Sequence, residues 1–308
     1  MSRSLWLCFL TVRALQAQDL ETQAAALRAL VAQAPKLPLE RTQIKIQAEI
    51  GYASSVAMDA NGTIYVLQRG ENADPVLVVN RDGKIIRSWG KGMYKIPHSI
   101  RIDSDGNIWT VDSSSSLVLK FTPEGRKLMG ILVGEQPAGR TGAIGTSDIG
   151  FGPNGRLFIS DGYGNARILE YNSKGQRVKQ WGRAGTGPGE FRQPHGIAVD
   201  DRGVIYVADR LNARLQRFDL DGKYLGEWDD LGRVTAVTFR DGALWIGTQF
   251  NNQPNEADGW QMKIDRQTGK ILGYMESGRS HHVLNVTARG ELLSGARPDI
   301  VWWFHPAK

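Results

Sequence analysis

The sequence predicts an all-β fold built from six copies of one repeating unit. Its 308 residues include 36 glycines, which occur at spaced turns without the triplet period of collagen. Segments such as SSVAMDANGTIYV and HGIAVDDRGVIYVA consist of an alternating apolar strand, a polar turn ending in glycine and a second alternating strand, the pattern of a β-hairpin. The turn glycines are Gly62, Gly106, Gly155, Gly203, Gly242 and Gly290.

Most repeats continue with a third and a fourth strand around another turn, as in ARILEYNSKGQRVKQWG. Four strands in a repeat of about 40 residues are typical of a β-propeller blade, so six repeats predict a six-bladed β-propeller. Three repeats end near a tryptophan, at Trp89, Trp181 and Trp228. We expect these rings to cover the seams between adjacent blades.

The ends of the chain predict how the ring closes. The last repeat ends with DIVWWFHP, one strand short of a blade. The alternating segment TQIKIQAEI, from Thr42 to Ile50, precedes the first inner strand. We expect it to pair beside Asp299 to Phe304 as the missing outer strand, which removes the open edges of the ring. Residues 41–308 are therefore assigned to the propeller.

Residues 19–40 predict a short helix and a linker. The apolar residues Leu20, Leu27, Leu30 and Val31 follow a helical period, and Pro35 ends the pattern. We interpret this helix as a packing or capping element without chemistry of its own.

Residues 1–18 predict a secretory signal. Arg3 precedes the apolar stretch from Leu5 to Val12, and the small residue Ala17 marks the expected cleavage site. This predicts a secreted or periplasmic protein, the alternative being a disordered or helical N-terminus of a cytoplasmic one. Cys8 is the only cysteine, which excludes a disulfide within the chain, and no run of 18 apolar residues predicts a membrane span.

One position of the repeat holds three of the five histidines of the chain. It lies eight residues before the turn glycine, or seven in blade five, whose turn is one residue shorter. There the innermost strand begins and faces the central channel. Blades two, four and six carry histidine there, and small hydroxyl residues fill the position in the other three blades. The occupants, in blade order, are Ser54, His98, Ser147, His195, Thr235 and His282.

This alternation predicts a metal site. Around a six-fold ring it places three imidazoles about 120° apart on one level. Three neutral imidazoles leave a tetrahedral position open, as catalytic zinc requires, so we predict zinc on His98, His195 and His282. His281 remains an alternative third ligand.

A second shared position lies fifteen residues after the first. Arg69, Arg210 and Arg297 occupy it in blades one, four and six, and blade three has Gly162 there with Tyr163 beside it. An arginine at this position would reach the mouth of the channel and hold a carboxylate. The alternative is an ion pair between blades, with Asp209 or a neighbouring acid.

Several long strings of the sequence resemble a known family. They include VAMDANGTIYVLQRG, IPHSIRIDSDGNIW, ISDGYGNARILEYNSKGQRVKQWG and QPHGIAVDDRGVIYVADRLNARLQRF. Together they are similar to the lyase half of peptidylglycine α-amidating enzyme, a six-bladed propeller of NHL-type repeats, from about Ser54 to Phe304. The resemblance implies cleavage of an N-acyl or peptidyl α-hydroxyglycine into a primary amide and glyoxylate.

The resemblance also implies roles for individual residues. The family's three zinc-binding histidines correspond to His98, His195 and His282. Its catalytic tyrosine corresponds to Tyr163, and its two functional arginines correspond to Arg69 and Arg210. Zinc would act on the α-hydroxyl, Tyr163 would be the base with its pKa lowered by metal and arginine, and Arg69 or Arg210 would hold the substrate carboxylate.

The chain departs from the family pattern in three places. The family's calcium uses backbone carbonyls that correspond to Val56 and Ile100, and a carboxylate directly after the third histidine. That position is Val283 here, so calcium would lose its only charged ligand. Gly164 follows Tyr163 where a cysteine is usual. The copper monooxygenase domain is absent from the sequence, so a separate monooxygenase would supply the substrate.

Two other classes of function fit a propeller. A metal-dependent hydrolase of lactones or esters would use zinc to activate water, but such enzymes usually present carboxylate and amide ligands to calcium. A non-catalytic NHL module would bind RNA or protein through a basic face. The net charge of +6 is spread without long basic runs or interleaved aromatics, which disfavours nucleic acid as a partner.

Overall fold

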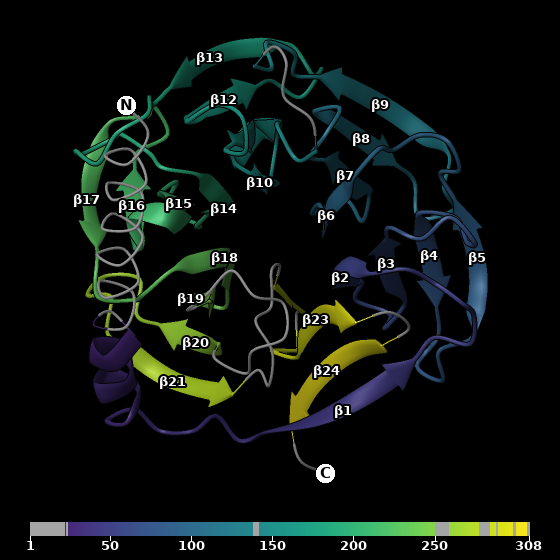
Figure 1. Ribbon diagram of the computed structural model, residues 1–308, viewed down its shortest axis with the longest axis horizontal. Helices are drawn as coiled ribbons and strands as arrows, with labels where there is room; N and C mark the ends of the chain where they lie inside the picture. Colours follow the sequence, from purple (N-terminus) through teal and green to yellow (C-terminus); the bar gives the residue numbers. More distant parts are fainter. Residues whose placement is uncertain are drawn as a thin grey trace, which may run out of the picture.

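The computed structural model is a ring of six four-stranded antiparallel sheets around a central channel (Figure 1). It describes residues 22, 24–137, 142–249, 259–276, 284–287, 289–297 and 300–306. The predicted all-β, six-bladed propeller is confirmed.

Each blade runs from an inner strand at the channel to an outer strand at the rim (Figure 1). Blade 1 comprises β2 (Ala53–Met58), β3 (Ile64–Gln68), β4 (Val76–Val79) and β5 (Ile85–Trp89). Blade 2 comprises β6 (Pro97–Ile102), β7 (Ile108–Asp112), β8 (Leu117–Phe121) and β9 (Lys127–Leu132). Blade 3 comprises β10 (Asp148–Phe151), β11 (Leu157–Asp161), β12 (Arg167–Tyr171) and β13 (Arg177–Trp181).

The second half of the ring repeats this order. Blade 4 comprises β14 (Pro194–Val199), β15 (Ile205–Asp209), β16 (Arg214–Phe218) and β17 (Tyr224–Trp228). Blade 5 comprises β18 (Val234–Arg240), β19 (Ala243–Thr248), β20 (Trp260–Ile264) and β21 (Ile271–Glu276). Blade 6 comprises β22 (Asn285–Val286), β23 (Leu292–Arg297), β24 (Ile300–Pro306) and β1 (Leu39–Lys45).

In blades 1, 2 and 4 the turn between the first two strands is built by an aspartate side chain and a glycine. In blade 2 the Oδ1 of Asp103 accepts hydrogen bonds from the backbone N–H of Asp105 (3.0 Å) and Asn107 (2.8 Å). Gly106 adopts a φ of +82°, which favours glycine. This geometry explains why the D-x-x-G spacing recurs and why it locates the hairpins in the sequence.

The three tryptophans lie on the seams between blades, as predicted. Trp89 of blade 1 stands 5.9 Å, centroid to centroid, from Phe121 of blade 2. A Cβ on Gly125, in the outer turn of blade 2, would lie 2.8 Å from the Trp89 ring, so a glycine there lets the indole lie flat on the next blade. Trp181 lies against Gly222 and Trp228 against Gly269 in the same way.

The ring closes by pairing the two ends of the chain. β1 runs antiparallel to β24, with Thr42 opposite Trp303, so the predicted pairing is confirmed. The predicted bounds are wrong, because the strand starts at Leu39 and ends at Lys45. Beyond Lys45 the chain leaves β24 and crosses to blade 1, where the N–H of Gln47 donates to the carbonyl of Gly83 and Ile50 is buried in the core.

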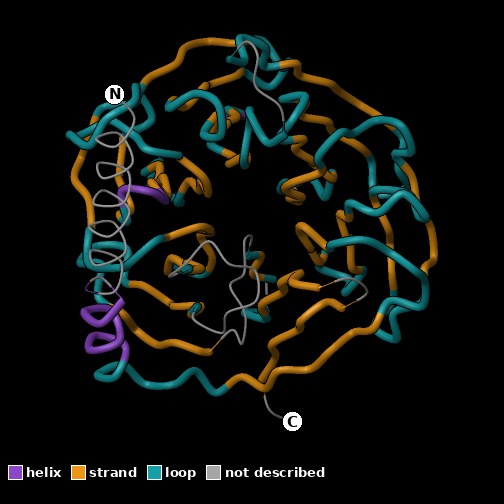
Figure 2. The backbone as a smooth tube through the Cα atoms, viewed as in Figure 1, coloured by secondary structure: helices purple, strands orange, loops and turns teal. Residues whose placement is uncertain are grey.

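A short helix packs on the rim of the propeller, as expected. Residues 24–31 are helical, and the segment lies beside β17 and β21 (Figure 2). Leu27 and Val31 are buried against blades 4 and 5, and the helix ends before Pro35. The predicted signal segment and Leu20 lie outside the described residues. None of the helices in the described part of the chain is long and apolar enough to cross a membrane.

Candidate functional site

The residues that start the inner strands lie in β-bulges. The pairing of β6 with β7 skips His98, and the pairing of β14 with β15 skips His195. The same irregularity skips Ser54 in blade 1 and Thr235 in blade 5. A bulge frees a residue from the ladder and redirects its side chain, and bulges are common beside active sites. The repeat therefore turns one sequence position toward the channel in successive blades.

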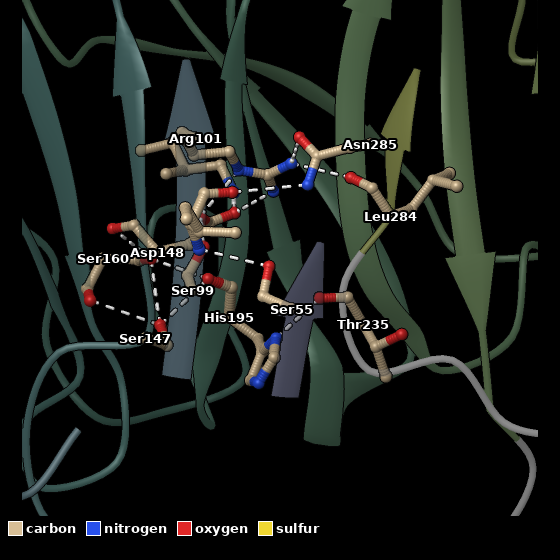
Figure 3. Close-up of polar contacts among 12 residues, drawn as sticks. Ser55, Ser99, Arg101, Ser147, Asp148, Ser160, His195, Thr235, Leu284 and Asn285 are labelled. Atoms are coloured by element: carbon tan, nitrogen blue, oxygen red, sulfur yellow. Dashed lines mark hydrogen bonds and ion pairs between the residues drawn. The ribbon is translucent and has the colours of Figure 1, made fainter. Parts of the chain in front are cut away.

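A backbone carbonyl orients each of the two described histidines. Nδ1 of His98 lies 2.6 Å from the carbonyl oxygen of Ser147. Nδ1 of His195 lies 2.6 Å from the carbonyl oxygen of Thr235 (Figure 3). Since a carbonyl oxygen only accepts, both Nδ1 atoms carry the proton and both Nε2 atoms present a lone pair. Metal-binding histidines are held in this way by an acceptor on the opposite ring nitrogen.

Both lone pairs are directed at one phenol oxygen. Nε2 of His98 lies 2.8 Å, and Nε2 of His195 3.0 Å, from the hydroxyl oxygen of Tyr163. The rings of His98 and His195 are 5.0 Å apart and inclined at 70°. The structure thus brings together three of the predicted site residues around one point.

Glycines on both sides of Tyr163 allow this approach. Tyr163 lies in the loop between β11 and β12. A Cβ on Gly162 would lie 1.8 Å from the carbonyl oxygen of Pro194, and one on Gly164 would lie 1.8 Å from that of Ile144. A larger residue at Gly162 would push the loop away from blade 4, and one at Gly164 would push it away from the segment that contains Ile144; either change would displace Tyr163.

The surroundings keep both histidines neutral. Burial, followed by the positive charge of Arg69, lowers the pKa of His98 to about 3. Burial, followed by His98 and Arg210, holds the pKa of His195 well below its usual value. Because metals bind neutral imidazole, these two side chains would need no deprotonation to bind a metal at neutral pH.

Burial raises the pKa of Tyr163 to about 12. Arg210 and Arg69 lower this pKa, as the sequence predicts, but their effect is smaller than that of burial. With the chain's own groups alone, the phenol is protonated at neutral pH.

Arg69 is exposed at the mouth of the channel. Its Nε donates to the carbonyl of Pro97 at 2.8 Å, and its guanidinium lies 5.4 Å from the ring centroid of Tyr52. This Nε contact leaves both terminal nitrogens directed away from the backbone. No carboxylate within the described ranges forms an ion pair with Arg69, which fits the predicted role as a carboxylate clamp.

Arg210 is buried, and two of its contacts are with neutral carboxamides. Its Nη2 donates to Oε1 of Gln249 at 2.7 Å, and its Nη1 to Oε1 of Gln193 at 3.3 Å. Asp209, the alternative partner considered from the sequence, instead accepts from Arg214 at 2.9 Å and from Asn212 at 2.7 Å. The positive charge of Arg210 is therefore not used in an ion pair with the neighbouring acid.

Some predicted site residues lie outside the described part of the chain. These are His281, His282 and Val283, and the side chain of Arg297 is not described either. Among the described residues no group of three or more His, Cys, Asp or Glu side chains is arranged to hold a metal ion. The third zinc ligand thus remains a prediction.

Sequence reasoning missed the residues that support the two arginines. Tyr52, Gln193 and Gln249 contact or flank the guanidinium groups. A signal was present, because Tyr52 and Gln193 both lie two residues before the channel-facing position of their blades.

Comparisons with known proteins agree with the fold and identify the family. A family described as "6-bladed beta-propeller" matches residues 147–289. The probable peptidyl-alpha-hydroxyglycine alpha-amidating lyase pgal-1 of Caenorhabditis elegans is 30% identical over 284 residues, covering 80% of this chain and 79% of the relative. The chain belongs to the peptidyl-α-hydroxyglycine α-amidating lyase family. This membership confirms the predicted family and the assignment as a lyase-like enzyme, and disfavours a non-catalytic NHL module.

Other members and neighbours extend the comparison. The peptidylglycine alpha-amidating monooxygenase of Rattus norvegicus is 28% identical over 297 residues, which cover 82% of this chain and 30% of that protein. A virginiamycin B lyase from Staphylococcus aureus has a TM-score of 0.59 at 13% identity, covering 87% of this chain and 99% of that one. A gluconolactonase from Xanthomonas campestris has a TM-score of 0.61 at 12% identity, covering 90% and 92%. The two structures show a shared fold alone.

The candidate site formed by His98, His195 and Tyr163 occupies only one end of the channel. A cavity of about 450 Å³ opens at the other end, where the inner strands finish, and is lined by residues such as Phe151, Val237 and Phe239. Arg101 and Asn285 also line it. These two residues lie between the cavity and the histidines, so the two ends of the channel are separated by a polar layer (Figure 3).

Proposed function

We propose that the chain is a zinc-dependent lyase that cleaves an N-acyl or peptidyl α-hydroxyglycine into a primary amide and glyoxylate. The observation that carries the proposal is the convergence of the Nε2 atoms of His98 and His195 on the hydroxyl of Tyr163. Membership in a family of amidating lyases supports this reaction, and pgal-1 bears its name.

The described ligands fit zinc. Two neutral imidazoles with fixed lone pairs are the donors that zinc prefers, and His282 would complete the set. A bound zinc ion would supply a Lewis acid for the α-hydroxyl group and a positive charge that favours the ionised form of the nearby phenol. The carbonyls of Ser147 and Thr235 hold the two rings in the required tautomer.

The proposed reaction removes the proton of the α-hydroxyl group, breaks the bond between the α-carbon and nitrogen, and adds a proton to nitrogen. The α-hydroxyl loses its proton, the electron pair of that O–H bond forms the C=O of glyoxylate, the bond between the α-carbon and nitrogen breaks, and nitrogen takes a proton to become the primary amide. Tyr163 would move this proton; the proposal is supported by the hydrogen-bond distance of its oxygen from both histidines.

The arginines would divide two tasks. Arg69 presents its terminal nitrogens to solvent and would bind the substrate carboxylate by a bidentate contact. Arg210 is fixed by two carboxamides and would keep a positive charge beside Tyr163, whose pKa it lowers more than Arg69 does. The pair thus fits a substrate that ends in a carboxylate.

The substrate would come from a separate enzyme. An α-hydroxyglycine arises when a monooxygenase inserts oxygen into the C–H bond of a terminal glycine, and the rat relative is named as such a monooxygenase. We place this lyase downstream of that class of reaction. We also propose that the N-terminal signal directs it to a secreted or periplasmic location.

The test uses the purified full chain loaded with zinc and an N-acyl α-hydroxyglycine. Glyoxylate and the primary amide should appear in equal amounts, well above the rate without enzyme. The His98→Ala variant provides the background at the same protein concentration. Failure of the parent to release glyoxylate from several acyl substrates, combined with turnover of a lactone, would replace the lyase by a hydrolase.

A further inference from the structure

A buried polar network fills the middle of the channel, where the family resemblance places a calcium ion. Its centre is the guanidinium of Arg101, on the inner strand of blade 2. The side chain of Arg101 is 7% exposed and that of its partner Asp148, on the inner strand of blade 3, is 3% exposed. Isolated charges at this depth are costly, so their contacts decide what the site can hold.

All three nitrogens of the guanidinium donate hydrogen bonds. Nε and Nη2 bind the two carboxylate oxygens of Asp148, with an Nε to Oδ1 distance of 2.9 Å. Nη1 donates to the carbonyl of Leu284 at 2.6 Å and to Oδ1 of Asn285 at 3.0 Å. Both acceptors belong to blade 6, on the far side of the channel from Asp148 (Figure 3).

Asn285 connects this charge pair to two backbone carbonyls. Its Nδ2 donates to the carbonyl oxygens of Val56 and of Ile100, the latter at 3.3 Å. The opposite orientation of the amide would direct its oxygen at two carbonyls and its NH₂ group at a guanidinium, so the contacts fix the amide as described.

The two carbonyls are the ones that the family resemblance assigns to calcium. In this chain an N–H donor lies between them and a guanidinium lies directly behind it. Calcium needs six to eight oxygen ligands at about 2.3–2.6 Å, and the nearest carboxylate, Asp148, is already bound to Arg101. A divalent cation would meet positive hydrogens instead of free oxygens, so these residues do not fit calcium.

The same contacts perform the task that a central ion would perform. Besides Arg101, Asp148 accepts from the Oγ of Ser99 at 2.6 Å and from the N–H of Ile197 at 3.4 Å. With Val56 and Asn285 included, the network joins inner strands from blades 1, 2, 3, 4 and 6. We propose that Arg101, Asp148 and Asn285 replace the calcium of the family as the cross-link of the channel, which makes the fold of this chain independent of calcium.

The first arm of the test measures calcium directly. The full chain is freed of metal on a chelating resin, and its thermal unfolding is followed by circular dichroism with and without about 5 mM CaCl₂, above the range in which weak calcium sites saturate. The midpoint should not change, and calorimetric titration with calcium should show no saturable binding. A calcium-dependent rise of several degrees, or saturable binding, would overturn the proposal.

The second arm tests the guanidinium. Arg101→Leu leaves Asp148 buried without its charge partner and should lower the midpoint by roughly 5–10 °C. Arg156→Leu is the matched control, because Arg156 also pairs with a buried acid, Glu170, but reaches only one neighbouring blade. The smaller effect expected for the control distinguishes loss of the channel network from loss of any buried ion pair.

Arg101→Lys covers the case in which the leucine variant does not fold. Lysine keeps the charge but cannot hold two carboxylate oxygens and blade 6 at once, so it should unfold at a lower temperature than Arg156→Lys. If the Arg101 variants unfold at the parent's temperature, or no lower than their Arg156 counterparts, the proposal is wrong. The measurement needs neither zinc nor substrate, so its outcome is independent of the lyase reaction.

Discussion

The imidazole of His98 lies edge to face on that of His195, with ring centroids 5.0 Å apart, although the two residues come from the second and the fourth blade. The pair is close because each inner strand has a β-bulge where its pairing with the second strand of the blade begins. Neither ring can be charged at low cost, since burial lowers the pKa of each. The first prediction is therefore that the two neutral rings bind the same zinc ion.

Replacing His98 or His195 with alanine should abolish zinc binding and leave the fold intact. The propeller core consists of apolar seams away from the histidines, so it does not depend on the metal. The parent should hold about one zinc per chain by mass spectrometry of the eluted metal, and either variant much less. His305→Ala is the control, because His305 lies on β24 and should retain the zinc. Global unfolding of the parent on zinc removal would contradict this view.

The equivalence of blades explains why these two histidines could be predicted from sequence. Each lies at a constant distance from a turn glycine, and strand pairing converts that distance into one level of the channel. The same logic located the tryptophan seams and the pairing of β1 with β24. It did not fix the bounds of β1, because contacts with blade 1, far away in sequence, decide where the strand leaves β24.

The residues that hold the channel together could not be predicted in this way. Arg101 and Asn285 both lie five residues before the turn glycine of their blades, and Asp148 lies seven residues before its own. These positions do not show that the three side chains are partners, because that depends on how far each one reaches across the channel. The pKa of Tyr163 could not be predicted from the sequence either. Two arginines and burial act on it in opposite directions, and only the folded geometry shows that burial dominates.

Replacing Arg69 with alanine should mainly weaken substrate binding. The loss of a bidentate contact to a carboxylate should raise KM by about 10- to 100-fold, with a smaller change in kcat. Steady-state kinetics of glyoxylate release would measure both constants. Arg87→Ala is the matched control, since Arg87 belongs to the outer strand of the same blade and is exposed. An unchanged KM in Arg69→Ala would assign the carboxylate to another group.

Replacing Tyr163 with phenylalanine should mainly reduce turnover. The change removes only the hydroxyl that contacts His98 and His195, so the loop and the zinc content should be preserved. Loss of a group that moves a proton should lower kcat by roughly 10²- to 10⁴-fold, while KM changes little. Normal turnover in a zinc-loaded variant would keep the reaction and exclude Tyr163 from the proton transfer.

The last prediction concerns the stability of a blade at low pH. Burial alone would raise the pKa of Asp103, but hydrogen bonds from Trp109, Asn107 and Lys120 outweigh it and lower the pKa below the usual 3.8. The folded state therefore favours the ionised carboxylate. This contribution is present above the unfolded pKa and is lost as the pH falls through the lower pKa of the folded state.

Asp103→Asn should accordingly reduce the free energy of unfolding by about 1–2 kcal/mol at pH 7. The difference from the parent should shrink as the pH falls from about 4 toward the lower pKa of the folded state, because the unfolded carboxyl group takes up a proton before the folded one does. Urea unfolding at pH 7 and at pH 3 measures it, with Asp105→Asn, an exposed acid of the same turn, as the control. A difference that stayed constant down to pH 3 would mean that side-chain shape, and not the negative charge of the carboxylate that accepts from Trp109, stabilises the turn.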